Sequence, residues 1–222
     1  MKNQSTIETV LTADGTVTLY LPDKDETYHS VNGALTESLH VFIDAGLKPI
    51  SHQQSSISIL EIGFGTGLNA LLSWQFARSH RVKIHYCSSE KFPLNESIFS
   101  ALHYGEKVAM EDEFKQLHTC QWNETVKLDE YFSLEKMDQG IEEIIGIENA
   151  DLVFYDAFAP RVQPELWTIS IFEKIYSLMK TGGVLVTYCA KGEVKRNLKT
   201  AGFTVETLPG PPGKREMTRA RK

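Results

Sequence analysis

The stretch Ile57-Ser-Ile-Leu-Glu-Ile-Gly-Phe-Gly-Thr-Gly-Leu-Asn-Ala-Leu-Leu72 decides the fold. Its first six residues are rich in β-branched side chains, which is typical of a buried strand. Three glycines at alternate positions follow, and the run after them is compatible with a helix. Glycines let a backbone approach a ligand closely, and a helix N-terminus offers free N–H groups to an anion. The stretch therefore predicts a loop that binds a nucleotide-like ligand.

The spacing of the three glycines narrows the choice of ligand. A dinucleotide fingerprint would have its third glycine where the chain has Leu68, and no Gly-Lys-Ser/Thr follows, as a P-loop would require. The pattern Glu61-x-Gly63-x-Gly65-x-Gly67 instead resembles the first motif of class I S-adenosylmethionine-dependent methyltransferases. The loop N–H groups suit the methionine carboxylate of that cofactor, and its positive charges favour a carboxylate such as Glu61. A glycine turn without a ligand is the alternative.

Length and composition indicate a single soluble domain. The 222 residues suffice for a full α/β core but are few for two domains. No apolar run approaches the ~18 residues of a membrane span. Residues 1–6 lead into no apolar signal core, so we expect a cytoplasmic protein. Cys87, Cys120 and Cys189 form no Cys-x-x-Cys pair and the seven histidines show no metal-ligand spacing, which predicts reduced thiols and no metal site.

Charge is distributed unevenly along the chain. Residues 181–222 carry nine basic and three acidic residues, a net charge of +6, whereas residues 1–180 carry −12. A local basic patch on an acidic protein can bind a polyanion. The candidates for phosphate contacts are therefore Lys214 and Arg215, with Lys191, Lys195 and Arg196, and a solvated C-terminal face is the alternative.

The N-terminal residues predict a small extension in front of the glycine loop. Two alternating runs, residues 8–12 and 16–21, flank an Asp-Gly turn, which is a strong hairpin signal. Apolar residues recur at helical spacing over residues 33–43. Residues 47–56 are predicted to be a mostly polar connector into the first parallel strand.

Acidic residues end two further predicted strands. Residues 82–89 form the second strand, which leads to Glu90, and residues 132–138 form the third, which ends at Asp138 and is followed by a helix from residue 139. In a doubly wound sheet, an acid after the second strand can accept both ribose hydroxyls of a nucleoside. An acid after the third strand can accept a hydrogen bond from an adenine amino group. The alternatives are an exposed strand-end acid for Glu90 and a helix N-cap for Asp138.

The C-terminal part of the chain predicts a central strand and an antiparallel edge. Residues 150–155 form an apolar fourth strand that delivers Asp156 to its C-terminal end, where ligands bind in open α/β sheets. The elements expected after it are a turn at 181–183, a fifth strand at 184–188, a basic helix at 191–201, and a last antiparallel pair at 203–208 and 216–221.

These elements predict an α/β protein of the Rossmann-like class I methyltransferase type. Its sheet is expected to be mostly parallel and seven-stranded, with an antiparallel last strand. We divide the chain into an N-terminal hairpin and helix extension, residues 1–50, and a methyltransferase domain, residues 51–222, within one compact unit.

Several separated stretches resemble the methyltransferase half of the bacterial MnmC family, whose members modify the wobble uridine of certain tRNAs. The resemblance covers roughly residues 16–220. The chain ends at Lys222, without room for the flavin-dependent oxidase of two-domain members. The resemblance therefore implies a stand-alone MnmD-type enzyme whose oxidase partner is separate. The stretches are Leu60–Asn69, Glu90-Lys-Phe-Pro-Leu94, Asp156-Ala-Phe-Ala-Pro160 with Pro164 and Trp167, Gly213-Lys-Arg-Glu-Met217 and, near the N-terminus, Tyr28-His-Ser with Gly33, Glu37 and Val41-Phe42.

The resemblance implies S-adenosylmethionine as cofactor and the anticodon region of tRNA as partner. The reaction would convert 5-aminomethyl-(2-thio)uridine to its methylaminomethyl product and leave the carboxymethylaminomethyl precursor unprocessed. Asp156 would be the catalytic residue. The cofactor-binding residues would be Glu61, Gly63, Gly65, Thr66, Gly67, Asn69, Glu90, Lys91, Asp138 and Asp156. The substrate-binding residues would be Tyr28, Phe158, Pro160, Lys214, Arg215 and Glu216.

The implied acceptor is a primary alkyl amine, which sets the chemical task. If its pKa is near the ~10.4 of lysine, roughly one molecule in a few thousand is neutral at pH 7. Only the neutral form has a lone pair for a methyl group. We expect Asp156 to orient this amine rather than to act as a true general base, since an ordinary carboxylate matches so basic an amine poorly.

Aromatic residues near this aspartate have two possible uses. Phe158 and Pro160 would wall the pocket and stack on the uracil ring, or pack against a neighbouring helix. Tyr28 would close over cofactor or substrate, or be a packed aromatic. Trp167 is expected to belong to the core.

Other functions stay open on the sequence alone. The first is a class I methyltransferase that acts on a small-molecule amine, with the basic C-terminus serving only solubility. Salt-dependent tRNA binding would separate it from the tRNA enzyme. The second is a non-catalytic module with the same fold, which would fail to bind S-adenosylmethionine. Leu68 disfavours a nicotinamide enzyme.

Overall fold

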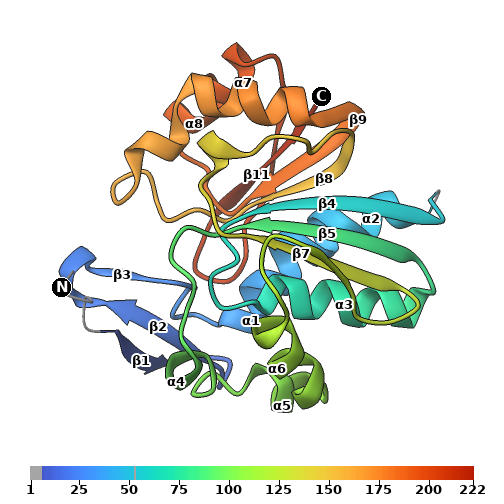
Figure 1. The fold of residues 1–222 in the computed structure, drawn as a ribbon. Helices are drawn as coiled ribbons and strands as arrows, with labels where there is room; N and C mark the ends of the chain where they lie inside the picture. The colour runs from blue at the N-terminus through green and yellow to red at the C-terminus, as the bar shows by residue number, and fades with distance from the viewer. Residues whose placement is uncertain (1–6, 53) are drawn as a thin grey trace.

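The computed structural model describes residues 7–52 and 54–222, which form a twisted central sheet with helices on both faces (Figure 1). The expectation about a signal core at residues 1–6 lies outside the described residues. The sheet has eight strands in the order β10-β11-β9-β8-β4-β5-β7-β6. The strands are β4 Ser56–Ile62, β5 Lys83–Ser89, β6 Thr125–Lys127, β7 Phe132–Met137, β8 Ala150–Tyr155, β9 Met179–Thr187, β10 Thr204–Pro209 and β11 Glu216–Arg221.

The predicted parallel sheet with an antiparallel last strand is confirmed. Strand β4 is central and pairs in parallel with both β5 and β8, so that Ile59 lies opposite Tyr86 on one side and Leu152 on the other. Strand β11 pairs antiparallel with β9 and β10. The sheet has one strand more than predicted, because the three residues of β6 pair antiparallel with β7. Three residues are too short to show a clear period of two.

Alternating side chains of the central strands feed two hydrophobic cores. Ile57 and Ile59 of β4 lie in one core, and Leu60 and Ile62 lie in the other. This two-sided burial explains the nearly continuous apolar run at 57–62. Helix α3 (Leu68–His80) covers the first face, and α7 (Ile169–Leu178) and α8 (Gly192–Thr200) cover the second (Figure 1).

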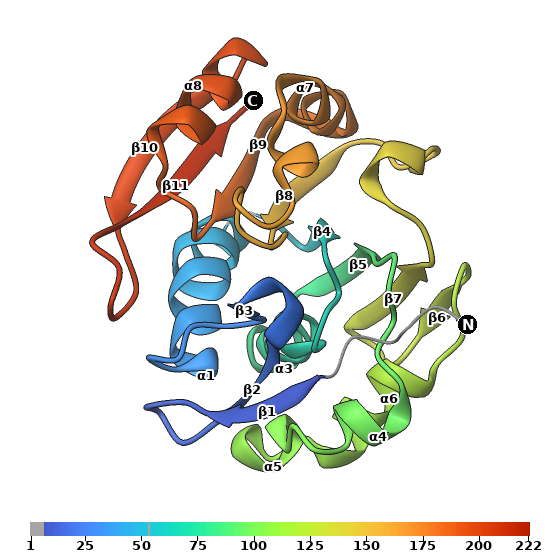
Figure 2. The same cartoon turned by 90° about the vertical axis from the view of Figure 1, so that its left-hand side faces the viewer.

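The N-terminal extension contains the predicted hairpin and a longer helix than predicted. Strands β1 (Glu8–Leu11) and β2 (Val17–Leu21) pair antiparallel, and after the one-turn η1 (Pro22–Lys24) a short β3 (Glu26–Thr27) joins them. This small sheet lies beside α5, whose Tyr104 hydroxyl donates to the Val17 carbonyl (2.5 Å; Figure 2).

Three helical segments follow one another without a break: α1 (Ala34–Ser38), a π-helical η2 (Leu39–Leu47) and α2 (Lys48–Ser51). The first part of the connector predicted at 47–56 is therefore wrong. Helical backbone continues through Pro49 because proline is tolerated in the first turn of a new segment.

Two other predictions of local structure are also wrong. The helix expected from residue 139 is only the one-turn η3 (Ile141–Glu143), confined between Gly140 and Gly146. The turn expected at 181–183 lies inside β9, where the register against β8 shifts after Ala150. The remaining elements are α4 (Glu96–Phe99), α5 (Tyr104–Val108), α6 (Glu111–Thr119) and η4 (Pro164–Trp167).

Two expectations from composition can be compared with the structure. Cys87, Cys120 and Cys189 are all free thiols. Among the described residues, no helix combines the length and the apolar character that crossing a membrane would require.

Candidate active site

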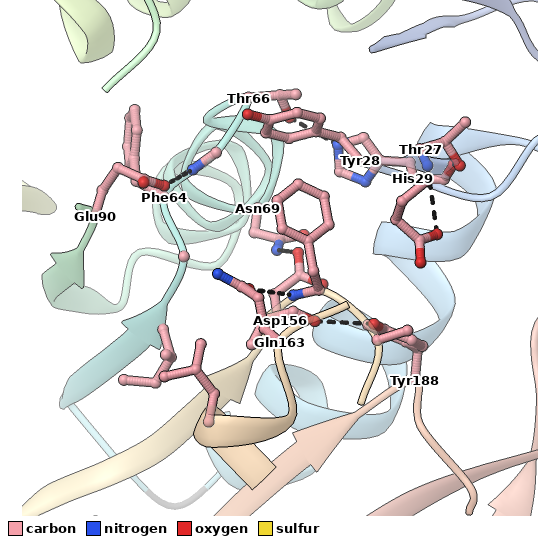
Figure 3. A pocket seen from close by; sticks show the side chains of 18 of the residues that line it. Thr27, Tyr28, His29, Phe64, Thr66, Asn69, Glu90, Asp156, Gln163 and Tyr188 are labelled. Carbon is pink, nitrogen blue, oxygen red and sulfur yellow. Dashed lines mark hydrogen bonds between the residues drawn. The ribbon is translucent and has the colours of Figure 1, made fainter. Parts of the chain in front are cut away.

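A cleft of about 600 Å³ opens at the C-terminal ends of β4, β5 and β8 (Figure 3). Backbone hydrogen bonds join these strand ends: Gly63 N–H donates to the Ser89 carbonyl (2.9 Å), and Asp156 N–H donates to the Ile62 carbonyl (3.1 Å). The volume is in the range of small-molecule and cofactor sites. The cleft therefore has the position and the size expected for a ligand site in an open α/β sheet.

The glycine loop forms one wall of the cleft. Gly63, Gly65 and Gly67 have φ values of +92°, +51° and +73°, which side chains rarely adopt. A Cβ on Gly63 would lie 3.0 Å from the Asp156 carbonyl oxygen, so the loop packs directly against the end of β8. These glycines leave backbone, rather than side chains, facing the cleft.

Glu90 lies across the loop, at the end of β5. One carboxylate oxygen accepts from Gly65 N–H (2.9 Å), and the other accepts from Phe92 N–H (2.7 Å). Burial raises the pKa of this carboxyl, and the backbone hydrogen bonds oppose that shift. The predicted neighbours are placed differently: Lys91 lines the cleft and pairs with Glu142 (2.9 Å), whereas Asp138 is exposed beyond β7 and is not part of the lining.

A hydrogen-bonded chain joins two carboxyl groups beneath the loop. Asn69 Nδ2 donates to Glu61 Oε1 (3.1 Å) and to Asp156 Oδ2 (2.9 Å), and Ser88 Oγ donates to Glu61 Oε2 (2.7 Å). Burial raises the pKa of Glu61 to about 8 and that of Asp156 to about 7. Asn69 Oδ1 is buried and has no hydrogen-bond partner. Glu61 is 1% exposed and lies behind the cleft lining, where it reaches the cleft through its hydrogen bond from Asn69 and its charge interaction with Asp156.

The other side of Asp156 faces an ion pair between the buried Glu37 and the partly exposed Lys214. Lys214 Nζ lies 2.5 Å from Glu37 Oε1 and 4.0 Å from the centroid of the Tyr188 ring, and Glu37 also accepts from Ser30 N–H (2.8 Å). Glu37 raises the pKa of Asp156 and Lys214 lowers it, both to a smaller extent than burial. We call Gly63, Gly65, Asn69 and Glu90 the cofactor half of the cleft, and Glu37, Asp156, Tyr188 and Lys214 the acceptor half.

The N-terminal extension covers both halves of the cleft and forms its aromatic roof. The Tyr28 ring meets Phe158 edge-on, with centroids 4.9 Å apart, and its edge would lie 3.4 Å from a Cβ on Gly65. His29 Nε2 lies 2.7 Å from Thr66 Oγ1. Arg161 also holds the extension in place. Its guanidinium donates a hydrogen bond to the Lys24 carbonyl (3.2 Å) and forms an ion pair with Glu26 (3.2 Å). Residues from the extension thus contact the glycine loop directly (Figure 3).

The structure brings only part of the predicted site together. Tyr28, Gly63, Gly65, Thr66, Asn69, Glu90, Lys91, Asp156, Phe158 and Lys214 line the cleft, whereas Glu61, Gly67, Asp138, Pro160, Arg215 and Glu216 do not. Glu216 pairs with Lys195 instead (3.0 Å). Trp167 is buried as expected, and its Nε1 donates to the Phe158 carbonyl (2.8 Å). Glu37, Tyr188 and His29 line the cleft without having been predicted.

His29 and Glu37 stand in stretches that resemble the MnmC family, but neither they nor Tyr188 carried a local signal for a place in the cleft. Glu37 is one acid on a helix that is otherwise ordinary, and Tyr188 follows an apolar strand. Only the fold brings the N-terminal helix, the end of β9 and the β10–β11 loop to the same cavity.

The strand order, the antiparallel β11 and the glycine loop define a class I methyltransferase fold. A family described as S-adenosyl-L-methionine-dependent methyltransferase matches residues 103–222. The chain belongs to this family of S-adenosylmethionine-dependent methyltransferases.

Relatives with similarity over most of the chain are named tRNA 5-methylaminomethyl-2-thiouridine biosynthesis bifunctional protein MnmC. The protein of Cupriavidus metallidurans is 33% identical in an alignment 231 residues long, gaps included, which covers 96% of this chain and 34% of the relative. That of Leptospira interrogans is 34% identical over 212 residues, which cover 87% and 32%. The chain therefore spans about a third of the length of these curated relatives.

Two solved structures are similar in fold. MnmC2 from Aquifex aeolicus has a TM-score of 0.82 and 29% identity, covering 99% of this chain and 71% of that one. Spermidine synthase from Thermotoga maritima has a TM-score of 0.56 at 15% identity, covering 96% and 67%, which is a likeness of fold alone.

Proposed function

We propose that this chain methylates the primary amine of 5-aminomethyl-(2-thio)uridine at the wobble position of tRNA, in the cytoplasm. The names of the MnmC relatives refer to biosynthesis of the corresponding 5-methylaminomethyl-2-thiouridine. The observation that carries the proposal is the position of Asp156. This carboxyl lies at the junction of the cofactor half and the acceptor half, under a roof of aromatic rings.

The cofactor half has the donors and acceptors that S-adenosylmethionine needs. Backbone N–H groups of the glycine loop suit its carboxylate, the unpartnered Asn69 Oδ1 suits its ammonium group, and Glu90 suits its ribose hydroxyls. Thr66 and Lys91 border these positions, and Gly67 shapes the loop. Glu61 acts through Asn69, and Asp138 acts on Glu90 through its charge. When bound, the cofactor supplies an electrophilic methyl group on its sulfonium.

The acceptor half can hold an amine in one orientation. Asp156 accepts a hydrogen bond from the amine, while Asn69 fixes the opposite side of its carboxylate. The raised pKa of Asp156, about 7, brings it nearer to the amine than an ordinary carboxylate, but still some three units below ~10.4. We therefore assign Asp156 mainly to orientation, with the amine proton lost to water, and positioning supplies much of the rate enhancement.

The aromatic roof suits the pyrimidine ring. Tyr28 and Phe158 present ring surfaces beside Asp156, and Pro160 follows in the same loop. Val31 and Phe92 line the cleft while 53% and 65% exposed, so they offer apolar surface at its mouth. Single-stranded anticodon bases can be splayed out and stacked on such side chains.

Exposed basic residues suit the tRNA backbone. Lys191 directly before α8, Arg196 on α8 and Arg215 in the β10–β11 loop are exposed. Lys195 and Lys214 instead pair with Glu216 and Glu37. We therefore place phosphate contacts on the first three residues. A separate oxidase partner would supply the free amine.

A methyl-transfer assay tests the proposal. Purified protein and labelled S-adenosylmethionine are mixed with tRNA from cells that lack this activity, and the nucleosides are analysed by mass spectrometry. The proposal predicts one added methyl group on 5-aminomethyl-(2-thio)uridine. Transfer to free small amines but not to tRNA would identify a small-amine methyltransferase and contradict it.

A further inference from the structure

A cluster of three metal-ligating side chains lies outside the cleft, on the outer part of the sheet. His85 and Cys87 are two residues apart on β5, and Glu135 lies directly opposite Cys87 on β7. One ligand atom from each lies within 4.8 Å of the other two. Cys87 belongs to the core on the α7 side of the sheet, together with Leu60. None of the three residues lines the cleft.

The distances between the ligand atoms match a single small ion. His85 Nε2 lies 3.3 Å from Cys87 Sγ, and Cys87 Sγ lies 4.0 Å from Glu135 Oε2. In a tetrahedral zinc site, with Zn–S about 2.3 Å and Zn–N or Zn–O about 2.0–2.1 Å, ligand atoms are about 3.5 Å apart. The two observed distances fall on either side of this value, so only small rotations of the side chains are needed.

Neighbouring hydroxyl groups hold two of the three side chains in place. His85 Nδ1 lies 2.9 Å from Ser133 Oγ, which leaves Nε2 directed at the cysteine. Thr125 Oγ1 donates to Glu135 Oε2 (3.0 Å) from the adjacent edge strand β6. Such outer partners commonly orient histidine and carboxylate ligands in metal sites. The three hydrogen-bonded strands fix the spacing of the residues themselves (Figure 2).

We propose that His85, Cys87 and Glu135 bind one Zn²⁺ ion, with solvent in the fourth position. A mixed nitrogen, sulfur and oxygen set suits zinc, which accepts all three donors. Coordination forms a zinc–thiolate bond and releases the thiol proton to solvent, and the thiolate and carboxylate together neutralise the dication. This departs from the absence of a metal expected from sequence, because the ligands come from neighbouring strands rather than from one short motif.

Cobalt substitution tests the site directly. The reduced, metal-free full chain is titrated with CoCl₂, and then with ZnCl₂ as competitor. The proposal predicts one Co²⁺ per chain, a near-ultraviolet thiolate-to-cobalt charge-transfer band, and loss of that band when one equivalent of Zn²⁺ is added. A cobalt spectrum without the charge-transfer band, or no binding of either ion, would overturn it.

Variants identify the ligands. Cys87→Ser is expected to abolish the charge-transfer band, whereas Cys120→Ser, which changes another free thiol, keeps it. Glu135→Gln retains the size of the side chain and is expected to weaken Zn²⁺ binding at least tenfold, with the circular dichroism spectrum unchanged. A band that survives Cys87→Ser would rule out this site. Methyl transfer is not needed for any of these readouts, so they stand apart from the proposed function.

Discussion

The two halves of the cleft differ in how the chain builds them. The cofactor half comes from one continuous stretch, in which β4, the glycine loop, α3 and β5 follow one another between Ser56 and Glu90. The acceptor half is assembled from four distant segments that contribute Glu37, Asp156, Tyr188 and Lys214. The first offers backbone N–H groups and one strand-end acid to a ligand, whereas the second brings together the charges of Glu37, Asp156 and Lys214. Substitutions in the two halves should therefore affect different steps.

Asp156→Asn should have the largest effect of all. Asparagine keeps an acceptor for Asn69 but loses the charge that orients the amine, so we expect methyl transfer to fall by about 10²–10⁴-fold. Single-turnover kinetics with saturating S-adenosylmethionine measure this step. The affinity for the cofactor, measured by calorimetry, should be unchanged. An equal loss in affinity and in transfer would contradict the claim that the two halves serve different steps.

Glu90→Gln should show the opposite pattern. A hydrogen bond to a charged group is worth about 1.5–3 kcal/mol, so cofactor affinity should weaken about tenfold to a hundredfold. The rate of transfer at saturating cofactor should change little. A variant with normal cofactor affinity would show that Glu90 serves only the loop backbone, through Gly65 and Phe92.

The Glu37–Lys214 pair gives a test that depends on pH. Asp156 titrates near pH 7, and activity should rise as the carboxylate forms above that pH. Because Lys214 lowers this pKa and Glu37 raises it, Lys214→Met should move the acid limb of kcat/KM to higher pH and Glu37→Gln to lower pH. We expect shifts of about 0.5–1 pH unit. Parallel shifts in both variants would contradict the charge assignment.

Glu61→Gln separates stability from activity. The pKa of Glu61 is about 8 in the folded protein and 4.5 in its ordinary state, so both states are protonated below pH 4.5 and the group then costs nothing. As the pH rises toward 8 the unfolded chain releases its proton first, which favours unfolding. The difference in unfolding free energy between the variant and wild type should therefore grow, in favour of the variant, by on the order of 3–5 kcal/mol from pH 5 to pH 9.

Denaturant unfolding at the two pH values measures this gain, and activity at pH 7 serves as the control. A glutamine can accept from Asn69 Nδ2 through its oxygen and donate to Ser88 Oγ through its amide nitrogen, so transfer should be nearly normal. A stability difference that does not depend on pH would mean that Glu61 is ionised in the folded protein.

The smallest effects should come from two exposed basic residues, one directly before α8 and one on it. Lys191→Ala and Arg196→Ala are each expected to weaken tRNA binding a few-fold and to reduce the salt slope by about 0.7–0.9 per lost phosphate contact. Filter binding at several salt concentrations measures both quantities. Lys48→Ala on α2, which removes another exposed lysine, is the matched control and should change neither.

The contrast between the halves also explains what could be predicted from sequence. The glycine loop, Glu90 and Asp156 were predicted because each follows a strand whose apolar pattern marks its end. Glu37 on α1 and Tyr188 after β9 were not predicted to line the cleft, because only tertiary packing brings these two elements together and such packing leaves no periodic pattern in the sequence. Lys214 was predicted as a phosphate contact and instead pairs with Glu37. A sequence alone does not reveal which basic side chains form ion pairs within the protein.

A crystal structure with S-adenosylhomocysteine tests the division of the cleft most directly. Our account predicts that the ribose hydroxyls contact Glu90, that the amino-acid end lies on the glycine loop next to Asn69 Oδ1, and that the sulfur faces Asp156, with Tyr188 and Lys214 left free for an acceptor. A ligand whose amino-acid end contacts Lys214 or Tyr188, with Glu90 untouched, would contradict it.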